Sequence, residues 1–167
     1  IARTQWTKMY LKIDREPTTD PTAVEGELVA SPSPQTTQAT YSATSGHGHL
    51  PRGGVSFETA PMTADTEVTG PLVLNVWISG TSEDADIHVV LRNIGPDGKD
   101  VCEVGQRGDM VPGVTKGWLR ASHRKLDPAK SLPYRPYHAH NEHQWLKPGE
   151  IVECRVEIWP TSMVFRK

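Results

Sequence analysis

Apolar and polar residues alternate along several short segments of this chain, which is the pattern of strands with one buried face. The first such segment is 6–13, WTKMYLKI, in which Met9, Leu11 and Ile13 fall on one face. The last is 149–160, GEIVECRVEIWP, in which one face is charged. Its other face consists of the apolar residues Val152, Cys154, Val156 and Ile158. We therefore predict a half-buried strand in each segment.

Between these two segments, the same pattern predicts strands at 55–59, 65–80 and 85–95, and the start of another at 114–127. The sequence 95-GPDGK-99 predicts a turn, because Pro presets φ and Gly accepts a left-handed backbone. With 100–105 as the returning strand, we expect residues 86–105 to form a hairpin.

The region 14–54 is polar and rich in Pro, Ser and Thr, which is typical of loop. Within it, only 26–30 and 39–43 resemble minor strands. No segment of a dozen residues shows the 3.6-residue apolar period of a helix. The pattern therefore predicts an all-β fold, either a β-sandwich or a jelly roll.

The composition favours a single domain over 1–167, with 1–54 as a loop-rich lead-in and 55–167 as the main sandwich. Gly and Pro number 14 each, which suits short strands joined by many turns. The net charge is −2 and no apolar run is long enough to span a bilayer, so neither nucleic acid nor a membrane is expected as a partner. The chain begins without Met or a signal peptide, and we expect a fragment of a cytoplasmic protein, with secretion of the parent left open.

The two cysteines, Cys102 and Cys154, do not form a CxxC pair, which argues against a zinc ribbon or a redox motif. Each lies in an apolar strand pattern, so we predict two free, buried thiols. A disulfide between them is the alternative, and nothing in the sequence requires it.

The densest group of chemically capable residues lies in 133-PYRPYHAHNEHQWLKPGE-150, which contains His138, His140, Glu142 and His143. Two histidines at i and i+2, with a third nearby, could ligate zinc, and a catalytic histidine is the other chemical alternative. The segment has no HExxH helix and no Cys ligand, and the chain has no G-x-S-x-G nucleophile motif. We therefore predict no catalytic residue, metal or cofactor, and interpret the segment as a proline-fixed connection between strands.

Two further groups are weaker candidates for a metal site. His47 and His49 could share one face of an extended segment, but two ligands do not make a site. The acids Glu83, Asp84 and Asp86 lack the further oxygen ligands and the Gly of an EF-hand loop. We expect these acids to cap the start of the following strand, with Asp86 accepting backbone hydrogen bonds.

Tryptophan supplies the largest apolar side chains in the predicted strands. The five are Trp6, Trp77, Trp118, Trp145 and Trp159. Each one in a strand is expected to lie mainly in the core, with an interface position as the alternative, whereas Trp145 sits at the end of a loop.

Several sequence elements occur in an order that resembles a known family. A V-x-G-P element is present at 68–71, an S-x-x-x-D element at 82–86 and a P-D-G turn at 96–98. An L-x-P-G-E element follows at 146–150, and W-P-T-S at 159–162. In this order the elements resemble the C-terminal domain of X-Pro dipeptidyl-peptidases and cocaine-esterase-type hydrolases, the CocE/NonD family. The likeness covers roughly residues 55–167, and WTKMYL near the N-terminus resembles the family's opening strand.

The resemblance implies a jelly-roll β-sandwich of the galactose-binding-domain-like type. In this family the domain packs on an α/β-hydrolase domain that carries a Ser-Asp-His triad. That triad would precede Ile1, so the resemblance implies no catalytic residue in this chain. In the family a further strand follows the V-F element, so we also expect one or more C-terminal strands to be missing here.

We therefore predict a non-catalytic C-terminal β-sandwich domain of an X-Pro dipeptidyl-peptidase or a CocE/NonD acyl esterase. Its expected partners are the α/β-hydrolase catalytic domain of the same chain, whose active-site cleft it would help to wall, and further copies in a homo-oligomer. The predicted contact residues are Tyr134, Tyr137, His138, His140, His143 and Trp145.

Two alternatives remain at this point. The first is a stand-alone carbohydrate-binding jelly roll that stacks sugars on Trp145, Tyr134 and Tyr137. The second is a metal enzyme that uses the histidine segment. The sequence leaves the parent's substrate open between a peptide, an ester and a β-lactam side chain.

Overall fold

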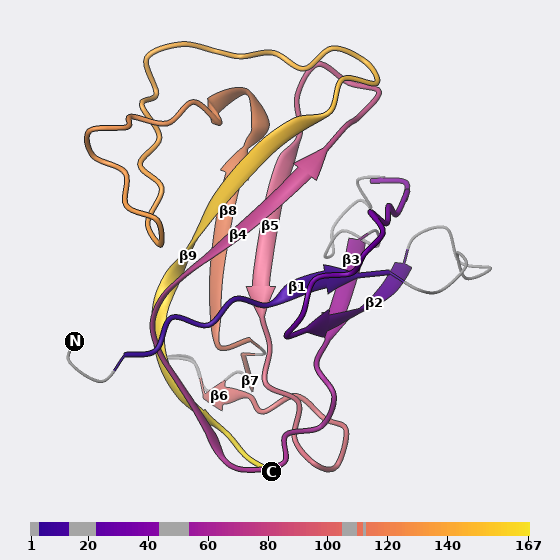
Figure 1. The fold of residues 1–167 in the computed structure, drawn as a ribbon, viewed down its shortest axis with the longest axis vertical. Helices are drawn as coiled ribbons and strands as arrows, with labels where there is room; N and C mark the ends of the chain where they lie inside the picture. Colours follow the sequence, from indigo (N-terminus) through magenta and orange to yellow (C-terminus); the bar gives the residue numbers. More distant parts are fainter. Residues whose placement is uncertain (1–3, 14–22, 44–53, 105–109, 112) are drawn as a thin grey trace. The chain divides into compact units, whose positions relative to one another are not determined.

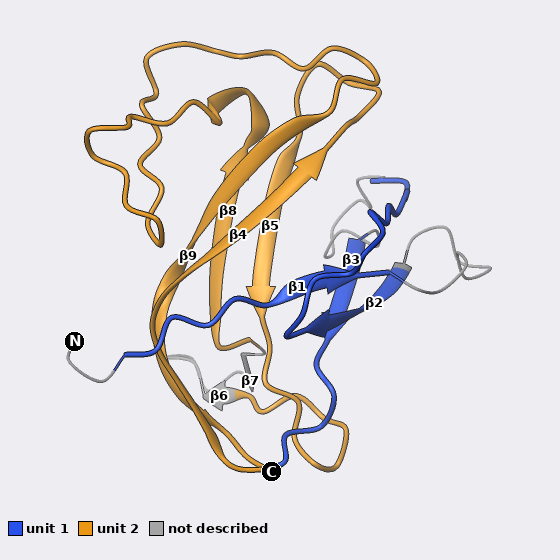
Figure 2. Ribbon diagram, in the orientation of Figure 1, with its two compact units in different colours: residues 1–63 blue, residues 64–167 orange. Residues whose placement is uncertain are grey.

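The computed structural model describes residues 4–13, 23–43, 54–104, 110–111 and 113–167. His47 and His49 lie outside these described residues. The chain forms two compact units, residues 1–63 and 64–167, which Figure 2 distinguishes by colour. Across the described ranges the regular structure consists of strands and one 3₁₀ turn, without an α-helix, so the all-β prediction is confirmed. The single domain over 1–167 stays a prediction.

The first unit contains a three-stranded sheet in the order β1-β2-β3. Strand β1 (Tyr10–Lys12) runs antiparallel to β2 (Ala23–Val29), and β2 runs parallel to β3 (Gly54–Glu58). Gly26 is required in β2 because a Cβ at this position would lie 2.6 Å from the carbonyl oxygen of Lys12. Most of the minor strand predicted at 26–30 belongs to β2, which ends at Val29, whereas the one suggested at 39–43 does not form.

The second unit is built on a four-stranded antiparallel sheet in the order β4-β9-β8-β5 (Figure 1). These strands are β4 (Thr66–Ile78), β5 (Asp86–Leu91), β8 (Thr115–Arg120) and β9 (Val152–Phe165). The predicted last strand is present, and it continues past Pro160 to Phe165. Over the described ranges, no helix combines the length and the apolar character needed to cross a bilayer.

The predicted hairpin over 86–105 is only partly correct. Its turn forms, with the amide of Gly98 donating to the carbonyl of Gly95 at 2.9 Å and with Gly98 at φ 75°. Strand β5, however, pairs along its whole length with β8, and the segment after the turn contributes β6 (Glu103–Val104), which pairs with β7 (Met110–Val111). Alternation identifies strands in a sequence, but it does not identify their partners.

A β-bulge divides the long pairing of β4 with β9. The pairing runs from Thr66↔Phe165 to Ile78↔Val152, and its register shifts between Gly70 and Leu72. Pro71 lies in β4 at this shift and Pro160 lies in the facing part of β9. Because neither proline has an N–H to donate, the ladder of hydrogen bonds is interrupted there.

The hydrophobic core of the second unit covers one face of its sheet. Buried and exposed residues alternate strictly along β8, and in the first half of β9 buried residues alternate with exposed or half-buried ones. The buried cluster consists of Leu119, Ala121, Leu146, Val152, Cys154 and Val156. Half-buried apolar residues of β4 and β5 pack against it. A sheet with one buried apolar face is what a β-sandwich requires, and the galactose-binding-like subtype stays an expectation.

The core position expected for the strand tryptophans is wrong. All five tryptophans are exposed, by between 55% and 63% of their surface. In the sheet of the second unit, an inward-facing residue stands directly beside each of three tryptophans, Trp77, Trp118 and Trp159. Because successive side chains of a strand point to opposite faces, these tryptophans lie on the face away from the core. The alternative, an interface position for these tryptophans, stays a prediction.

The cysteines are free, and the structure separates them by burial. Cys154 is fully buried in the core, and burial raises the pKa of its thiol. Cys102 is only half-buried. The prediction of free thiols is confirmed for both residues, and the prediction of burial holds for Cys154.

We predict that Gly117→Ala strongly destabilises the second unit. Gly117 is paired with Ile158 across β8 and β9, and a Cβ at this position would collide with the carbonyl oxygen of Glu157. Overpacking of this kind costs at least about 1–3 kcal/mol of the free energy of unfolding, measured by urea denaturation. Gly80→Ala is the control, because its Cβ would meet only an ordinary contact at 3.9 Å. Equal stability of the two variants would contradict the close approach of β8 to β9.

Candidate functional site

The candidate site lies in the second unit, where residues 124–151 connect the 3₁₀ turn η1 (Ala121–His123) to β9. Leu146, which is 3% exposed, anchors this connection in the core. Its amide donates to the carbonyl of Glu83 at 2.8 Å, and the amide of Gln144 donates to the carbonyl of Ser122 at 2.8 Å. The loop therefore has a defined path although it contains no strand.

Asp84 ties the turn at the end of β8 to the start of β5. Its carboxylate accepts hydrogen bonds from the amide of Ser122 at 2.8 Å, from the Ser122 hydroxyl at 2.7 Å and from the amide of Ala85 at 2.9 Å. Burial raises the pKa of Asp84, but the hydrogen bonds from Ser122 and Ala85 outweigh it, so the net shift is downward. The carboxylate is therefore held in its charged form.

The capping role expected of Asp86 belongs to Asp84. The carboxylate of Asp86 instead binds the guanidinium of Arg120 through two hydrogen bonds of 2.8 and 2.9 Å. Ser122 stands beside His123 in the chain and bonds an aspartate, and these are the three residue types of a hydrolase triad. Its side chain is fully buried, however, and its hydroxyl donates to Asp84, so it is not accessible to an external substrate.

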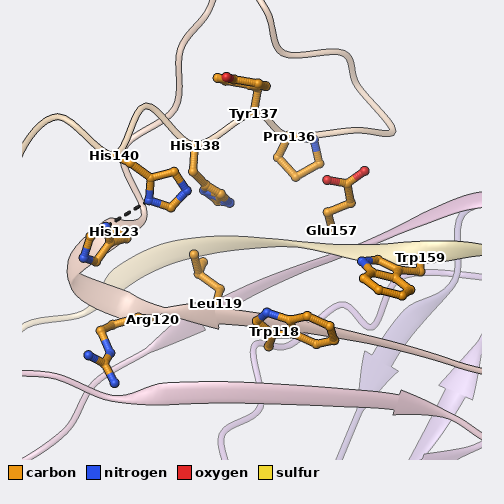
Figure 3. Close-up of a pocket in the computed structure, with 10 residues that line it drawn as sticks. All are labelled: Trp118, Leu119, Arg120, His123, Pro136, Tyr137, His138, His140, Glu157 and Trp159. Atoms are coloured by element: carbon orange, nitrogen blue, oxygen red, sulfur yellow. Dashed lines mark hydrogen bonds between the residues drawn. The ribbon is translucent and has the colours of Figure 1, made fainter.

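Four histidines gather where η1 meets the loop. The Nδ1 atoms of His123 and His140 are 2.9 Å apart, at hydrogen-bond distance, as Figure 3 shows. The ring of His143 packs edge-on against His123, with centroids 4.6 Å apart, and it stacks on Trp145 at 5.0 Å. His140 has φ 51°, a left-handed backbone that residues other than Gly seldom adopt.

The fourth histidine, His138, is half-buried beside this group. Its ring centroid lies 6.1 Å from that of His140, and its Nδ1 atom is buried without a hydrogen-bond partner. Burial lowers the pKa of His138, and the neighbouring His140 and His123 lower it further, so this imidazole is held neutral. In the part of the chain that the structure describes, no group of three or more His, Cys, Asp or Glu side chains could hold a metal ion.

A pocket of about 620 Å³ lies between the loop and the outer face of the sheet. Figure 3 shows loop residues 136–140 on one side and the strands on the other, with Trp118 on β8 and Trp159 on β9. The two indole rings lie 5.3 Å apart, and Glu157 extends from β9 toward Pro136. The pocket thus combines aromatic surface with one carboxylate and the imidazoles of the loop.

The structure brings together four of the six predicted contact residues. His138, His140, His143 and Trp145 belong to the histidine group, as described above. Tyr137 is 45% exposed and lies under the ammonium group of Lys130, which is 4.8 Å from its ring centroid. Tyr134 is half-buried. Whether these six residues form an interface stays a prediction.

Sequence reasoning missed His123, Trp118 and Trp159 as members of the site. His123 stands alone in 117-GWLRASHRK-125, and only the folding of the loop over η1 brings His140 to it. The two tryptophans were expected mainly in the core. Trp118 alternates with apolar or small neighbours on both sides and Trp159 follows the apolar Ile158, and this alternation was the signal that could have placed both on the outer face.

Comparison with known proteins agrees with this description. The family model for the X-Pro dipeptidyl-peptidase C-terminal non-catalytic domain matches residues 1–167. A protein of Mycobacterium bovis named Putative serine esterase Mb1866c is 32% identical over 117 residues, which are 67% of this chain and 17% of that protein. Putative serine esterase MT1883 of Mycobacterium tuberculosis matches to the same extent.

Solved structures give the same result. The CocE/NonD family hydrolase SACOL2612 from Staphylococcus aureus matches with a TM-score of 0.60 and 30% identity, covering 65% of this chain and 20% of that one. A second structure of that hydrolase matches with 31% identity. This chain therefore spans only a small part of the length of its relatives.

The strands of both units, with the exposed tryptophans on the outer face of the second unit's sheet, are those of an all-β domain. The chain belongs to the family of X-Pro dipeptidyl-peptidase C-terminal non-catalytic domains. The predicted membership in the CocE/NonD hydrolase family is confirmed. The alternative of a stand-alone carbohydrate-binding module is not favoured.

We predict that Asp84→Ala lowers the free energy of unfolding by about 1–3 kcal/mol at neutral pH, because it leaves the buried groups of Ser122 without a partner. The pKa of Asp84 is lowered in the fold, so its contribution is complete above the ordinary value of 3.8 and is lost as the pH falls through the lowered pKa. Urea denaturation of both proteins across this pH range measures the difference.

The control for this prediction is Glu153→Ala, which removes an exposed carboxylate from β9. It should change the free energy of unfolding by less than about 0.5 kcal/mol. The role assigned to Asp84 would be contradicted if Asp84→Ala changed the free energy of unfolding as little as this control does. It would also be contradicted if the change were the same in acid as at neutral pH.

Proposed function

We propose that this domain supports an α/β-hydrolase catalytic domain of the same polypeptide, and that it contacts that domain through the outer face of the sheet in its second unit. The observation that carries the proposal is the exposure of Trp77, Trp118 and Trp159 on this one face. Tryptophans are enriched at protein interfaces, where they account for much of the binding energy. The names of the relatives, a serine esterase and a CocE/NonD family hydrolase, supply the kind of partner.

The three tryptophans lie on three neighbouring strands of the sheet, and two of them, Trp118 and Trp159, contact each other. Trp77 on β4 is paired with Glu153 on β9, whose neighbours Val152 and Cys154 face the core. Strand β9 also carries Trp159, which contacts Trp118 on the adjacent strand β8 at 5.3 Å. An exposed apolar group that is rimmed by polar residues marks an interaction surface, and the pair of Trp118 and Trp159 is such a group.

Charged residues on the same face give it the character of an interface rim. Arg155 donates to the side chain of Asn75 at 3.1 Å and to the carbonyl of Pro133 at 2.8 Å, which ties the loop to the sheet. Arg120 pairs with Asp86 beside Trp118. Arg120 is therefore paired with a carboxylate, whereas Arg155 is hydrogen-bonded to neutral oxygens, so a partner that covers this face would have to accommodate the charge of Arg155.

The arrangement of Trp145 weighs against a sugar-stacking role. One face of its indole is covered by the ring of His143, with the two planes 7° from parallel. Stacking on a sugar needs a free aromatic face, so the predicted platform of Trp145 with two tyrosines is partly occupied from within. Titration of the isolated domain with glycans tests this alternative, and saturable binding would favour it over the support role.

The remaining parts of the functional prediction are proposals. The exposed residues of the histidine loop, Tyr137, His140, His143 and Trp145, are proposed as a second contact with the catalytic domain. We also propose that the domain helps to wall the active-site cleft of the catalytic domain, that it takes part in a homo-oligomer and that the protein is cytoplasmic. The parent polypeptide is proposed to act on a peptide, an ester or a β-lactam side chain.

We predict that this chain alone does not hydrolyse a nitrophenyl ester, whereas the polypeptide from which it comes does. Its accessible groups include no recognisable nucleophile motif, and the proposal places the triad on the partner domain. Release of nitrophenol is followed for both proteins at equal molar concentration. Turnover by the isolated chain would overturn the non-catalytic assignment, and a parent without a G-x-S-x-G motif would overturn the proposed partner.

We predict that Trp77→Ser has a small effect in the isolated chain and a large effect in the longer polypeptide. Trp77 is 63% exposed, so its loss should change the free energy of unfolding of the isolated chain by less than about 0.5 kcal/mol. Loss of a buried interface tryptophan should cost at least about 2 kcal/mol in the longer polypeptide. Urea denaturation measures both values.

The matched control is Tyr41→Ser, which removes an aromatic side chain that is 43% exposed and lies in the first unit. It should have a small effect in both proteins. If Trp77→Ser is equally mild in both proteins, the outer face of the sheet is not the contact surface, and the proposal fails at that point.

A further inference from the structure

We propose that the hydrogen bond between His123 and His140 is an acid-sensitive switch, which holds the loop 124–151 on the turn η1 at neutral pH and releases it in acid. The two imidazoles come from different segments, and their Nδ1 atoms are 2.9 Å apart. Their ring centroids are 5.1 Å apart, and this geometry is that of a single N–H···N hydrogen bond. One Nδ1 atom therefore donates a proton and the other offers a lone pair.

The number of protons on the pair decides whether this bond can exist. A neutral imidazole has one N–H group and one lone pair, whereas an imidazolium has two N–H groups and no lone pair. The bond therefore survives with two neutral rings or with one charged ring, but not with two charged rings. Histidine changes its charge between about pH 5 and 8, so acidification in this range replaces an attraction between the two rings by a repulsion.

The bond lies at the base of a hairpin-like segment of the loop. Next to it, the amide of Ala139 donates to the carbonyl of Lys125 at 2.9 Å, and Leu126 forms a β-bridge with His138. His140 is exposed, so protons from the solvent reach the pair. Loss of the bond therefore frees the two arms of this segment at the end where they join η1.

The imidazole of His138 favours release in the same direction. Its Nδ1 atom is buried without a hydrogen-bond partner, so a proton added there would carry a buried, unpaired charge. Burial lowers the pKa of His138, and His140 and His123 lower it further. The stability that this ring contributes is therefore complete above its ordinary value of 6.5, and it is lost as the pH falls through the lowered pKa.

Most charged side chains on the elements around the pair are engaged with other groups. Glu142 is paired with Lys125 at 2.9 Å, and Arg120 is paired with Asp86 at 2.8 Å. The remaining groups are Asp84, which accepts hydrogen bonds from Ser122 and Ala85, and Arg124, which donates to the carbonyls of Ala121 and Gln144. These groups do not neutralise a second positive charge on the pair.

Glu157 is the other carboxylate that lines the same pocket. Figure 3 shows it beside Pro136, at the end of the pocket away from His123 and His140. Among the described residues, no hydrogen bond or ion pair joins a carboxylate to either imidazole of the pair. Two imidazolium ions at this position would therefore repel each other without a counter-ion in contact.

The backbone at His140 adds a second reason for release. The residue is held at φ 51°, a sparsely populated conformation for a residue with a side chain. Such a conformation persists only where surrounding contacts hold it, and the bond to His123 is one of these contacts. Once the bond is broken, relief of this strain favours the released loop. Because residues 136–140 form one wall of the pocket, release also opens the pocket that contains Trp118 and Trp159.

Hydrogen exchange measured by NMR tests the switch. The protection factor of the Ala139 amide is compared at about pH 8 and about pH 5, the range in which histidine titrates. We expect it to fall at least about fivefold in acid, as the loss of one hydrogen bond of ordinary strength requires. The amide of Val101, which donates to the carbonyl of Asn93 at 2.8 Å in a turn without histidine, should keep its protection.

Two variants remove the titrating groups of the pair. His123→Gln and His140→Asn replace an imidazole by an amide that takes up no proton, and Asn accepts the left-handed backbone at residue 140. In each variant, protection of the Ala139 amide should lose most of its dependence on pH. His88→Gln is the matched control, because it removes an exposed imidazole from β5, and it should behave as the unaltered chain does.

NMR of the ring nitrogens in the unaltered chain provides a test that does not depend on the stability of a variant. At about pH 8 one of the two Nδ1 atoms should carry a proton, and at about pH 5 both should carry one. The proposal is overturned if the pair does not gain its second proton in this range, or if Ala139 keeps its protection when both rings are charged. Variants that retain the full dependence on pH also overturn it, and none of these outcomes bears on the docking role of the outer face.

Discussion

The structure of the second unit depends on the pairing of β4 with β9. This register fixes, for every residue of both strands, which of the two faces of the sheet it occupies. Val152, Cys154 and Val156 are thereby directed into the core, and Trp77 and Trp159 are directed away from it. A slip of one residue would exchange the two sets, burying charges and exposing the core. The same pairing that stabilises the domain therefore also creates its tryptophan surface.

The loop that carries the histidines depends on this sheet for its position. Leu146 is inserted in the core, and Asp84 holds the turn at Ser122 from which the loop departs. Arg155 reaches from the outer face of β9 to the carbonyl of Pro133. The core, the turn and the outer face thus each fix one part of the loop, and the proximity of His123 to His140 follows from these attachments.

Local patterns in the sequence were sufficient for the fold class, the main strands and the turn at 95–99. They were sufficient because alternation and turn chemistry act over a few neighbouring residues. The partner of β5 and the position of His123 depend on residues distant in the chain, so no local pattern could supply them. The prediction for the tryptophans failed for a different reason. The general preference of large apolar side chains for burial suggested the core, but Trp118 lies between the buried Gly117 and Leu119, and this alternation indicates the opposite face. The order of the family's motifs supplied the identity of the domain, which composition and periodicity did not.

The close pair of Trp118 and Trp159 gives the domain an optical property of its own. With their rings 5.3 Å apart and tilted by 50°, the transition dipoles of the two indoles are near enough and skewed enough to couple. Coupled chromophores of this kind produce a paired positive and negative band in circular dichroism, whose size depends on the distance and angle between them. Because both indoles are exposed, any molecule that settles on this face and shifts either ring would change the band. The domain therefore carries, without a label, a reporter of whether its outer face is covered.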